Sequence, residues 1–185
     1  SKRDSRQLMS DASPPDFTNP DIHVNIYAIA LGSNKRHARF GDPRSILQAA
    51  ISALDDTASI CVIATAPIVD SAPIGPSLRR YANSAAIIET PLAPAGLLDA
   101  LKAVERRFGQ RRGQRWAARV LDLDIILWNG GLWNDSHLSI PHPHWRTRRF
   151  VADPLSAIAP TWRDPLCRLT VQQIAHRLRY RKGKR

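Results

Sequence analysis

Residues 23–34 read HVNIYAIALGSN and contain the clearest strand of the chain. Successive side chains of a strand point to opposite faces, so Ala28 and Ala30 share one face while Tyr27 and Ile29 share the other. Both faces are therefore apolar. A strand of this kind is buried on both sides, which predicts a central strand of a sheet.

The segments on either side of this strand alternate between helix and strand patterns. Asp42 followed by Pro43 predicts a helix start, with a capping side chain and a proline at the first helical position, and Pro94 opens a second helix. Thr170 is expected to cap a last helix. The remaining expected elements are strands at 59–69, 81–89 and 120–128, a short partner strand after the turn 129–131, and a helical turn at 146–152. The order β-α-β-β-α-β predicts an α/β (α+β) fold, a ferredoxin-like antiparallel sheet with helices packed on it in a single domain.

Length and composition fit this fold and exclude several classes of protein. The chain has 185 residues, of which 43% are hydrophobic and 23% charged, so a wholly disordered chain is excluded. It contains no run of about 18 apolar residues, and we expect no membrane span. Cys61 and Cys167 form no Cys-x-x-Cys pair. The two cysteines therefore indicate neither a disulfide scaffold nor a cysteine zinc site, and they predict a cytoplasmic protein.

Positive charge is concentrated in two segments. The net charge is +11; residues 102–119 contribute +6, with Glu105 as their one acid, and residues 177–185 contribute another +6. The rest of the chain is close to neutral. A basic terminal tail is typical of weak attraction to polyanions, whereas a basic cluster within the fold indicates an anionic ligand.

The stretch 120–127, VLDLDIIL, carries the most specific chemical feature. In a strand, Asp122 and Asp124 share one face, and Leu121 and Leu123 share the other. Two carboxylates about 7 Å apart along a strand repel each other unless a cation lies between them. Oxygen ligands of this kind suit Mg²⁺ together with substrate phosphates, so the pair predicts a metal site. Two ordinary exposed acids are the alternative.

An arginine-rich segment precedes the acidic pair. It contains Arg111, Arg112, Arg115, Trp116 and Arg119. Guanidinium groups bind phosphate in bidentate fashion, and a metal held by the aspartates would neutralise the same polyphosphate. Alone, such a segment is more often a solvated charge run or a nucleic-acid patch. Beside an acidic pair, a metal–triphosphate complex explains it better.

Two further pairs are weaker on their own. Tyr81 and Asn83 stand two positions apart in a strand and offer a ring and an amide on one face. His142 and His144 are a poor zinc set without further ligands, so we expect a phosphate or ribose contact there instead. The chain has no GxxxxGK[ST] loop and no GxSxG motif.

Together these residues resemble the 6-hydroxymethyl-7,8-dihydropterin pyrophosphokinase family. The similar blocks are, in chain order, residues 27–34 (YAIALGSN), residues 71–76 (SAPIGP) followed by Tyr81 and Asn83, residues 115–126 (RWAARVLDLDII), and residues 140–142 (IPH) followed by Arg148 and Phe150. The resemblance extends over about residues 24–175.

The resemblance implies transfer of pyrophosphate from ATP to the hydroxymethyl group of a dihydropterin, with release of AMP, in folate biosynthesis. It implies two Mg²⁺ ions on Asp122 and Asp124, which would hold the triphosphate in line with the attacking hydroxyl. Arg111 and Arg119 would be catalytic beside the two aspartates.

The resemblance also implies the contacts of the two substrates. The residues expected to contact ATP are Arg112, Arg115, Trp116, Arg119, His142 and Arg148. The residues expected to contact the pterin are Ser71, Ala72, Ile74, Tyr81, Asn83 and Phe150, with the rings of Tyr81 and Phe150 on its two faces. Arg115 and Trp116 would lie on a lid that closes over the nucleotide.

The sequence departs from the family pattern at two places. Ala117-Ala118 replaces the usual Gly-Pro before the signature arginine, which changes loop stiffness. Gly109 ends the second helix and is followed by Gln110, where the family commonly has a catalytic arginine. Arg111 and Arg112 are both candidates for the same phosphate, and we favour Arg111 because it lies nearer the helix end.

Two other classes of protein stay open. The basic segments are typical of a nucleic-acid-binding module, and an Asp-x-Asp strand also occurs in other metal-dependent transferases, such as nucleotidyltransferases. Our prediction is a monomeric pyrophosphokinase that binds neither nucleic acid nor membrane. We expect a flexible leader at 1–22, the pyrophosphokinase domain at 23–178 and a basic tail at 179–185.

Overall fold

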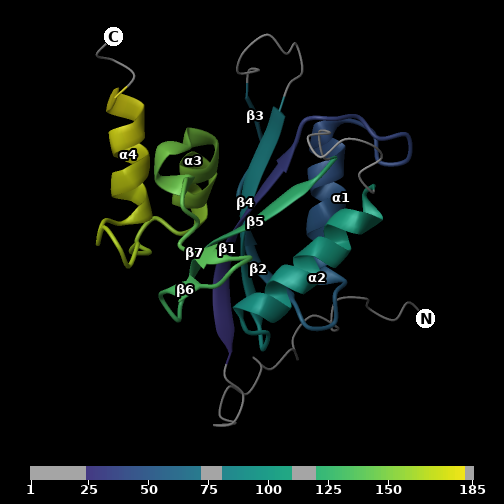
Figure 1. The fold of residues 1–185 in the computed structure, drawn as a ribbon. Helices are drawn as coiled ribbons and strands as arrows, with labels where there is room; N and C mark the ends of the chain where they lie inside the picture. Colours follow the sequence, from purple (N-terminus) through teal and green to yellow (C-terminus); the bar gives the residue numbers. More distant parts are fainter. Residues whose placement is uncertain (1–23, 72–80, 110–119, 182–185) are drawn as a thin grey trace, which may run out of the picture.

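The sheet is built around β1 (Asn25–Ser33), the central strand that residues 23–34 predicted (Figure 1). β1 pairs antiparallel with β4 (Tyr81–Thr90) on one side and with β5 (Asp122–Trp128) on the other. β2 (Cys61–Thr65) and β3 (Val69–Ser71) both pair antiparallel with β4. The predicted antiparallel sheet is therefore confirmed, with the order β2-β4-β1-β5.

This arrangement is seen in a computed structural model that describes residues 24–71, 81–109 and 120–181; of Ser71 and Arg181 it describes the backbone alone. Residues 1–23 and 182–185 lie outside these ranges, so the predicted boundaries at 22 and 178 stay predictions. None of the helices in the described ranges combines the length and the apolar character that a membrane crossing requires.

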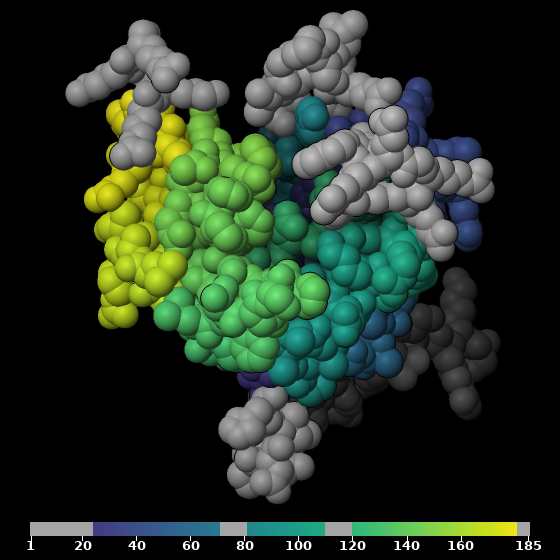
Figure 2. Space-filling view, in the orientation of Figure 1, coloured from purple at the N-terminus to yellow at the C-terminus, as the bar shows by residue number. Residues whose placement is uncertain are grey.

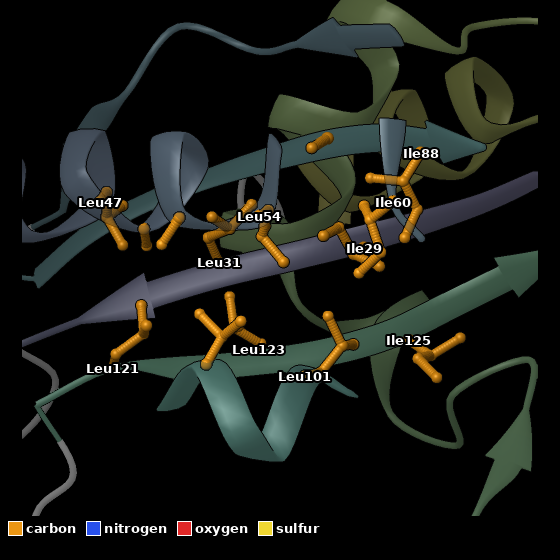
Figure 3. Packing of buried hydrophobic residues seen from close by; sticks show 14 of the residues in the cluster. Ile29, Leu31, Leu47, Leu54, Ile60, Ile88, Leu101, Leu121, Leu123 and Ile125 are labelled. Atoms are coloured by element: carbon orange, nitrogen blue, oxygen red, sulfur yellow. The ribbon is translucent and has the colours of Figure 1, made fainter. Parts of the chain in front are cut away.

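Helices cover both faces of the sheet. α1 (Pro43–Asp55) and α2 (Pro94–Arg107) pack on one face, and α3 (Arg149–Ile158) and α4 (Val171–Arg181) lie on the other (Figure 1). The alternation of β1 divides its side chains between two cores: Tyr27, Ile29 and Leu31 join the first, and Ala28 and Ala30 the second. Figure 3 shows the first core, in which Leu101 of α2 and Leu123 of β5 approach the β1 side chains.

The helix starts that the sequence predicted are confirmed. Asp42 caps α1, since its Oδ1 accepts a hydrogen bond of 2.8 Å from the backbone N–H of Ser45. At α4, the Thr170 hydroxyl accepts from the Gln173 N–H (3.2 Å), and the Gln173 side chain accepts from the Thr170 N–H (2.9 Å). This reciprocal pair is a capping box, which satisfies two donors that the first turn of a helix leaves free.

The predicted single strand at 59–69 is wrong, because the chain forms two short strands there, β2 and β3. Ala66 still donates its backbone N–H to Ala85 at 2.8 Å. Pro67 follows and has no N–H to continue the ladder, so the pairing breaks and resumes at Val69.

Two expectations for the C-terminal third are also corrected. The predicted helical turn at 146–152 is the 3₁₀ turn η1 (Trp145–Thr147) followed by α3, which continues to Ile158 through Pro154. Pro154, the sixth of the ten residues of α3, removes one hydrogen bond, while burial of Val151 and Leu155 on the sheet stabilises the helix.

The partner strand expected after 129–131 does not pair with β5. β6 (Trp133–Asn134) pairs instead with β7 (Ser139–Ile140) in a separate two-stranded sheet. Asn129 explains the departure, because its N–H donates to the Ile26 carbonyl and its side chain accepts from the Ile26 N–H, both at 3.0 Å. These bonds turn the chain away at the end of β5.

Candidate functional site

Three residues lie side by side across the strands at one end of the sheet. Gly32 of β1 is opposite Asn83 of β4 and also opposite Asp122 of β5. Residues directly opposite one another in antiparallel strands project to the same face. Asn83 and Asp122, which are 39 positions apart in the sequence, therefore share one face with only a glycine between them.

This face is the one that α3 and α4 cover farther along the strands. Asp124 lies opposite Ala30, which lies opposite Ala85, and both alanines belong to the core beneath α3. Along each strand the same face thus changes from apolar and covered to polar. Figure 2 shows the surface hollowed between the α2 layer, in teal, and the α3 layer, in green.

Gly32 keeps this polar face open. A Cβ at this position would lie 3.5 Å from the Asn83 Oδ1 atom, which is ordinary contact distance. A longer side chain would stand between Asn83 and Asp122. The glycine therefore allows the amide and the carboxylate to face a common ligand.

The prediction that Asp122 and Asp124 share a face opposite Leu121 and Leu123 is confirmed. Both leucines are buried in the first core, whereas both aspartates are half-buried on the other face. Within the described ranges, Asp124 has no ion pair and accepts no hydrogen bond. No group of three or more His, Cys, Asp or Glu side chains in those ranges could hold a metal ion, so within them a metal on this pair would take its further ligands from water or a substrate.

His142 lies beside the acidic pair because its backbone is bonded to β5. Its N–H donates to the Ile126 carbonyl at 3.0 Å, two residues beyond Asp124 in the strand. Its Nδ1 accepts a hydrogen bond of 3.2 Å from the His144 N–H. In the neutral ring the proton is therefore on Nε2, which is left as a donor.

Burial lowers the pKa of His142 below its ordinary value. The charge of Asp124 opposes this shift, and the charge of Arg148 adds to it. His142 is consequently neutral near pH 7, with its Nε2–H available for hydrogen bonding. The same couplings indicate that an acidic and a basic side chain, Asp124 and Arg148, both lie near this ring.

Arg148 and Phe150 stand at the start of α3. The Arg148 guanidinium carbon is 5.9 Å from the centre of the Phe150 ring, and that ring is 37% exposed. Tyr81 begins β4 and shares the face of Asn83, as predicted from their spacing. The rings of Tyr81 and Phe150, which both belong to the described residues, are not in contact with each other.

Sequence reasoning missed Glu105, the one acid in the basic segment 102–119. From α2, its Oε1 accepts the backbone N–H of Leu123 at 2.8 Å, and Lys102 Nζ lies 2.9 Å from its other oxygen. Leu123 is the residue between the two aspartates. The isolated negative charge of Glu105 among arginines was the available signal in the sequence. Its partner, the Leu123 N–H, lies 18 positions away and could not be seen there.

Several predicted site residues lie outside the described residues. These are Ala72, Ile74, Arg111, Arg112, Arg115, Trp116 and Arg119, and for Ser71 only the backbone is described. The structure brings together Asn83, Asp122 and Asp124 on one face and links Asp124, His142 and Arg148 electrostatically.

A sequence model of the family described as 7,8-dihydro-6-hydroxymethylpterin-pyrophosphokinase matches residues 28–160. The chain belongs to this family. The match includes the acidic pair, His142, Arg148 and Phe150, so the resemblance seen in the sequence is confirmed.

Individual relatives agree with this assignment. The chain is 41% identical over 138 residues to the 2-amino-4-hydroxy-6-hydroxymethyldihydropteridine pyrophosphokinase of Pseudomonas aeruginosa, covering 74% of this chain and 82% of that protein. It is 35% identical over 166 residues to the protein of the same name from Synechocystis, covering 90% of this chain and 81% of that protein.

Solved structures share the fold. The HPPK-DHPS of Plasmodium falciparum crystallised with pteroate superposes with a TM-score of 0.66 at 12% identity. The match covers 90% of this chain but only 43% of that longer chain. At this identity the likeness shows the fold alone.

The activity expected from the resemblance is confirmed by the family. Family members transfer pyrophosphate from ATP to hydroxymethyldihydropterin in folate biosynthesis, and this chain is an enzyme of that kind, with ATP and the pterin as its substrates. The family assignment replaces the two alternatives, a nucleic-acid-binding module and a nucleotidyltransferase.

Replacement of Glu105 tests whether α2 holds the strand that bears the aspartates. Glu105→Ala is expected to lower the free energy of unfolding by about 1–3 kcal/mol, because the Leu123 N–H loses its acceptor. It should also lower turnover, since Asp122 and Asp124 flank that N–H. Urea unfolding and steady-state kinetics measure the two effects.

Two variants control this experiment. Glu105→Gln keeps an acceptor oxygen and should retain more stability and more turnover than Glu105→Ala. Asp99→Ala removes an exposed acid from the same helix and should change neither. Normal stability and normal turnover of Glu105→Ala would show that the hydrogen bond does not hold the strand.

Proposed function

We propose that the polar face around Asp122, Asp124 and Asn83 is where pyrophosphate passes from ATP to the hydroxymethyl dihydropterin. The observation that carries this proposal is the cross-strand alignment of Asn83, Gly32 and Asp122. It sets an amide that suits a pterin beside carboxylates that suit a metal-bound triphosphate. The two substrates would then meet on one face.

The two carboxylates fit Mg²⁺, and we propose two ions bound with ATP. Both side chains are half-buried acceptors on one face, and Asp124 has no cationic partner among the described side chains. Magnesium retains several ligands from water and substrate phosphates, so two protein carboxylates are sufficient. When bound, the ions would neutralise the charge of the triphosphate and orient its β-phosphorus.

His142 and Arg148 bind phosphate or ribose oxygens of ATP in this proposal. The neutral His142 ring offers an Nε2–H donor, and Arg148 has no carboxylate partner within the described ranges. A guanidinium without an internal partner binds a phosphate at the cost of no existing ion pair. Burial of the histidine strengthens its hydrogen bond to an anion, because less water competes for the donor.

The pterin lies between the rings of Tyr81 and Phe150 in this proposal. Their rings do not contact each other, and Phe150 is 37% exposed, so a flat ligand could lie between them. Asn83 is only 6% exposed, and its amide would bond the polar edge of the pterin. A hydrogen bond from a buried amide to the pterin discriminates against a ring that lacks the matching polar edge. The remaining proposed contacts are Ser71, Ala72 and Ile74.

The arginine-rich segment completes the proposal on sequence grounds. Arg111 and Arg119 would act on the transferred group. The other residues proposed to contact ATP in this segment are Arg112, Arg115 and Trp116. Transition-state charge on the phosphoryl oxygens is what guanidinium groups stabilise best in this chemistry.

We further propose that the catalytic domain spans residues 23–178, between the leader at 1–22 and the tail at 179–185. The family match over 28–160 lies inside these limits. Two exposed thiols, Cys61 and Cys167, are free, which supports a reducing cytoplasmic location. We propose a monomer that binds no nucleic acid and no membrane.

Product analysis tests the proposed reaction directly. Incubation with ATP, Mg²⁺ and 6-hydroxymethyl-7,8-dihydropterin should yield AMP and the pterin diphosphate in equal amounts. ADP as the nucleotide product would indicate transfer of a single phosphoryl group and would overturn the proposal.

Asp124→Ala should lower turnover by more than about 100-fold, because even outer partners of metal ligands contribute 10–100-fold. The free energy of unfolding should hold steady or rise slightly, since removal of one carboxylate relieves repulsion from Asp122. Asp56→Asn, an exposed acid at the end of α1, is the control and should leave turnover unchanged. Near-normal turnover of Asp124→Ala at saturating Mg²⁺ would exclude the metal role.

Tyr81→Ala and Phe150→Ala should each weaken pterin binding by about tenfold, because ring stacking contributes about 0.5–1.5 kcal/mol beyond buried area. Binding of a nonhydrolysable ATP analogue should change far less. Titration calorimetry measures both affinities, and Tyr180→Ala, an exposed ring on α4, is the control. Equal losses for the two ligands would mean that these rings only support the fold.

A further inference from the structure

We propose that Asp164 is a positioning residue for Arg148, acting through the 3₁₀ turn η1. Asp164 lies in the connection between α3 and α4, where none of the predicted site residues lies. The proposal rests on the role in ATP binding given above to Arg148. In this proposal, the buried carboxylate of Asp164 determines where the phosphate-binding guanidinium of Arg148 lies.

Asp164 is fully buried, and both of its oxygens are occupied. Oδ2 accepts the indole N–H of Trp145 at 3.0 Å and lies 2.6 Å from Nη2 of Arg146. Oδ1 accepts the backbone N–H groups of Leu166 and Cys167 at 2.8 and 3.0 Å. One oxygen therefore bonds the turn η1, and the other fixes the loop from which the carboxylate itself projects.

Asp164 accepts the Trp145 indole N–H and balances the charge of Arg146, and both groups are costly to leave without it. Trp145 has no exposed surface, so its indole N–H has no access to water. Asp164 is the one carboxylate among the described residues that forms an ion pair with Arg146. The Arg146 side chain is 24% exposed and Asp164 is fully buried, so removal of the carboxylate would leave the guanidinium uncompensated and free to turn toward water.

A short series of backbone hydrogen bonds connects this pair to the site. The Arg148 N–H donates to the Trp145 carbonyl at 3.1 Å. The Arg148 carbonyl in turn accepts the N–H groups of Val151 and Ala152, which opens α3. The backbone of Arg148 is thus held on one side by the residue that Asp164 anchors and on the other by the helix.

A second aspartate in the same layer provides a matched comparison. Asp153 of α3 lies 3.2 Å from Arg149 Nη2 and 2.9 Å from Arg179 Nε. It joins α3 to α4 but has no bond to η1. If these aspartates affect ATP binding only by stabilising the fold, replacing Asp153 and replacing Asp164 should lower the affinity for ATP to the same extent.

The test measures the affinity for a nonhydrolysable ATP analogue by calorimetry and the stability by urea unfolding. Asp164→Ala should weaken analogue binding by about tenfold, as expected when a hydrogen bond to a charged group is lost. Trp145→Phe removes the indole N–H and keeps a ring, and it should weaken binding by a smaller factor. Asp153→Ala should lower stability and leave the affinity unchanged. Equal losses of affinity for the two aspartate variants would overturn the proposal.

A double-mutant cycle separates positioning from a general effect. Arg148→Ala alone should weaken analogue binding, and adding Asp164→Ala to it should change the affinity by less than about twofold. If the double variant loses affinity by the product of the two single-variant factors, the two residues act independently and the positioning role is overturned. If Arg148→Ala binds the analogue normally, the proposed ATP contact is wrong instead. If Asp164→Ala does not fold, Asp164→Asn and Trp145→Phe complete the same cycle, and normal affinity of both would overturn the proposal.

Discussion

The antiparallel register of β5 on β1 places Asp122 and Asp124 on the open end of the sheet face, and the site depends on this register. A slip of one residue would turn every side chain of β5 to the opposite face. The carboxylates would then enter the core where Leu121, Leu123 and Ile125 pack. Burial of two carboxylates in that shifted register would be far more costly than the loss of a few hydrogen bonds. Core packing and the acidic face therefore enforce the same register.

The exposed edge of β5 is used to build the rest of the site. An edge strand presents unpaired backbone groups, and two of these have partners outside the sheet. The Leu123 N–H donates to Glu105 of α2, and the Ile126 carbonyl accepts the His142 N–H. The register between β5 and β1 also shifts once. Ala28 is opposite Leu127 and Ile29 is opposite Ile125, so Ile126 is the extra residue of a bulge. One of the two contacts on this edge therefore holds β5 to α2, and the other positions His142.

The sequence predicted the parts of the molecule that local pattern controls. Asp42 and Thr170 cap helices through partners three residues away, and the alternation around Asp122 depends on strand geometry alone. The missed features depend on partners distant in sequence. Glu105 meets Leu123 across 18 positions, and Trp145 meets Asp164 across 19. Neither pairing leaves a periodic pattern, because each needs the tertiary fold to bring its members together.

Pattern also failed where burial overrides a local rule. Asp153-Pro154 is typical of a helix end, yet α3 continues through it because Val151, Ala152 and Leu155 are buried on the sheet. The continuous helix matters for the site, since Arg148 and Phe150 stand at its start. A free turn at this position would hold neither side chain against the sheet face.

In the proposed site, the charges of the described side chains favour a nucleotide that arrives together with its metal. Two carboxylates face one guanidinium, Arg148, and an imidazole that burial keeps neutral. These described charges are net negative, so in the proposed site the aspartates oppose a polyphosphate, and divalent cations together with the proposed arginines (Arg111, Arg112, Arg115 and Arg119) would offset them. A polyphosphate that enters with divalent cations brings the charge that the carboxylates lack, and its outer oxygens remain for Arg148 and the His142 donor. In the proposed site, the acidic pair would thus favour the metal complex of the nucleotide over the metal-free nucleotide at the binding step, before any bond is broken.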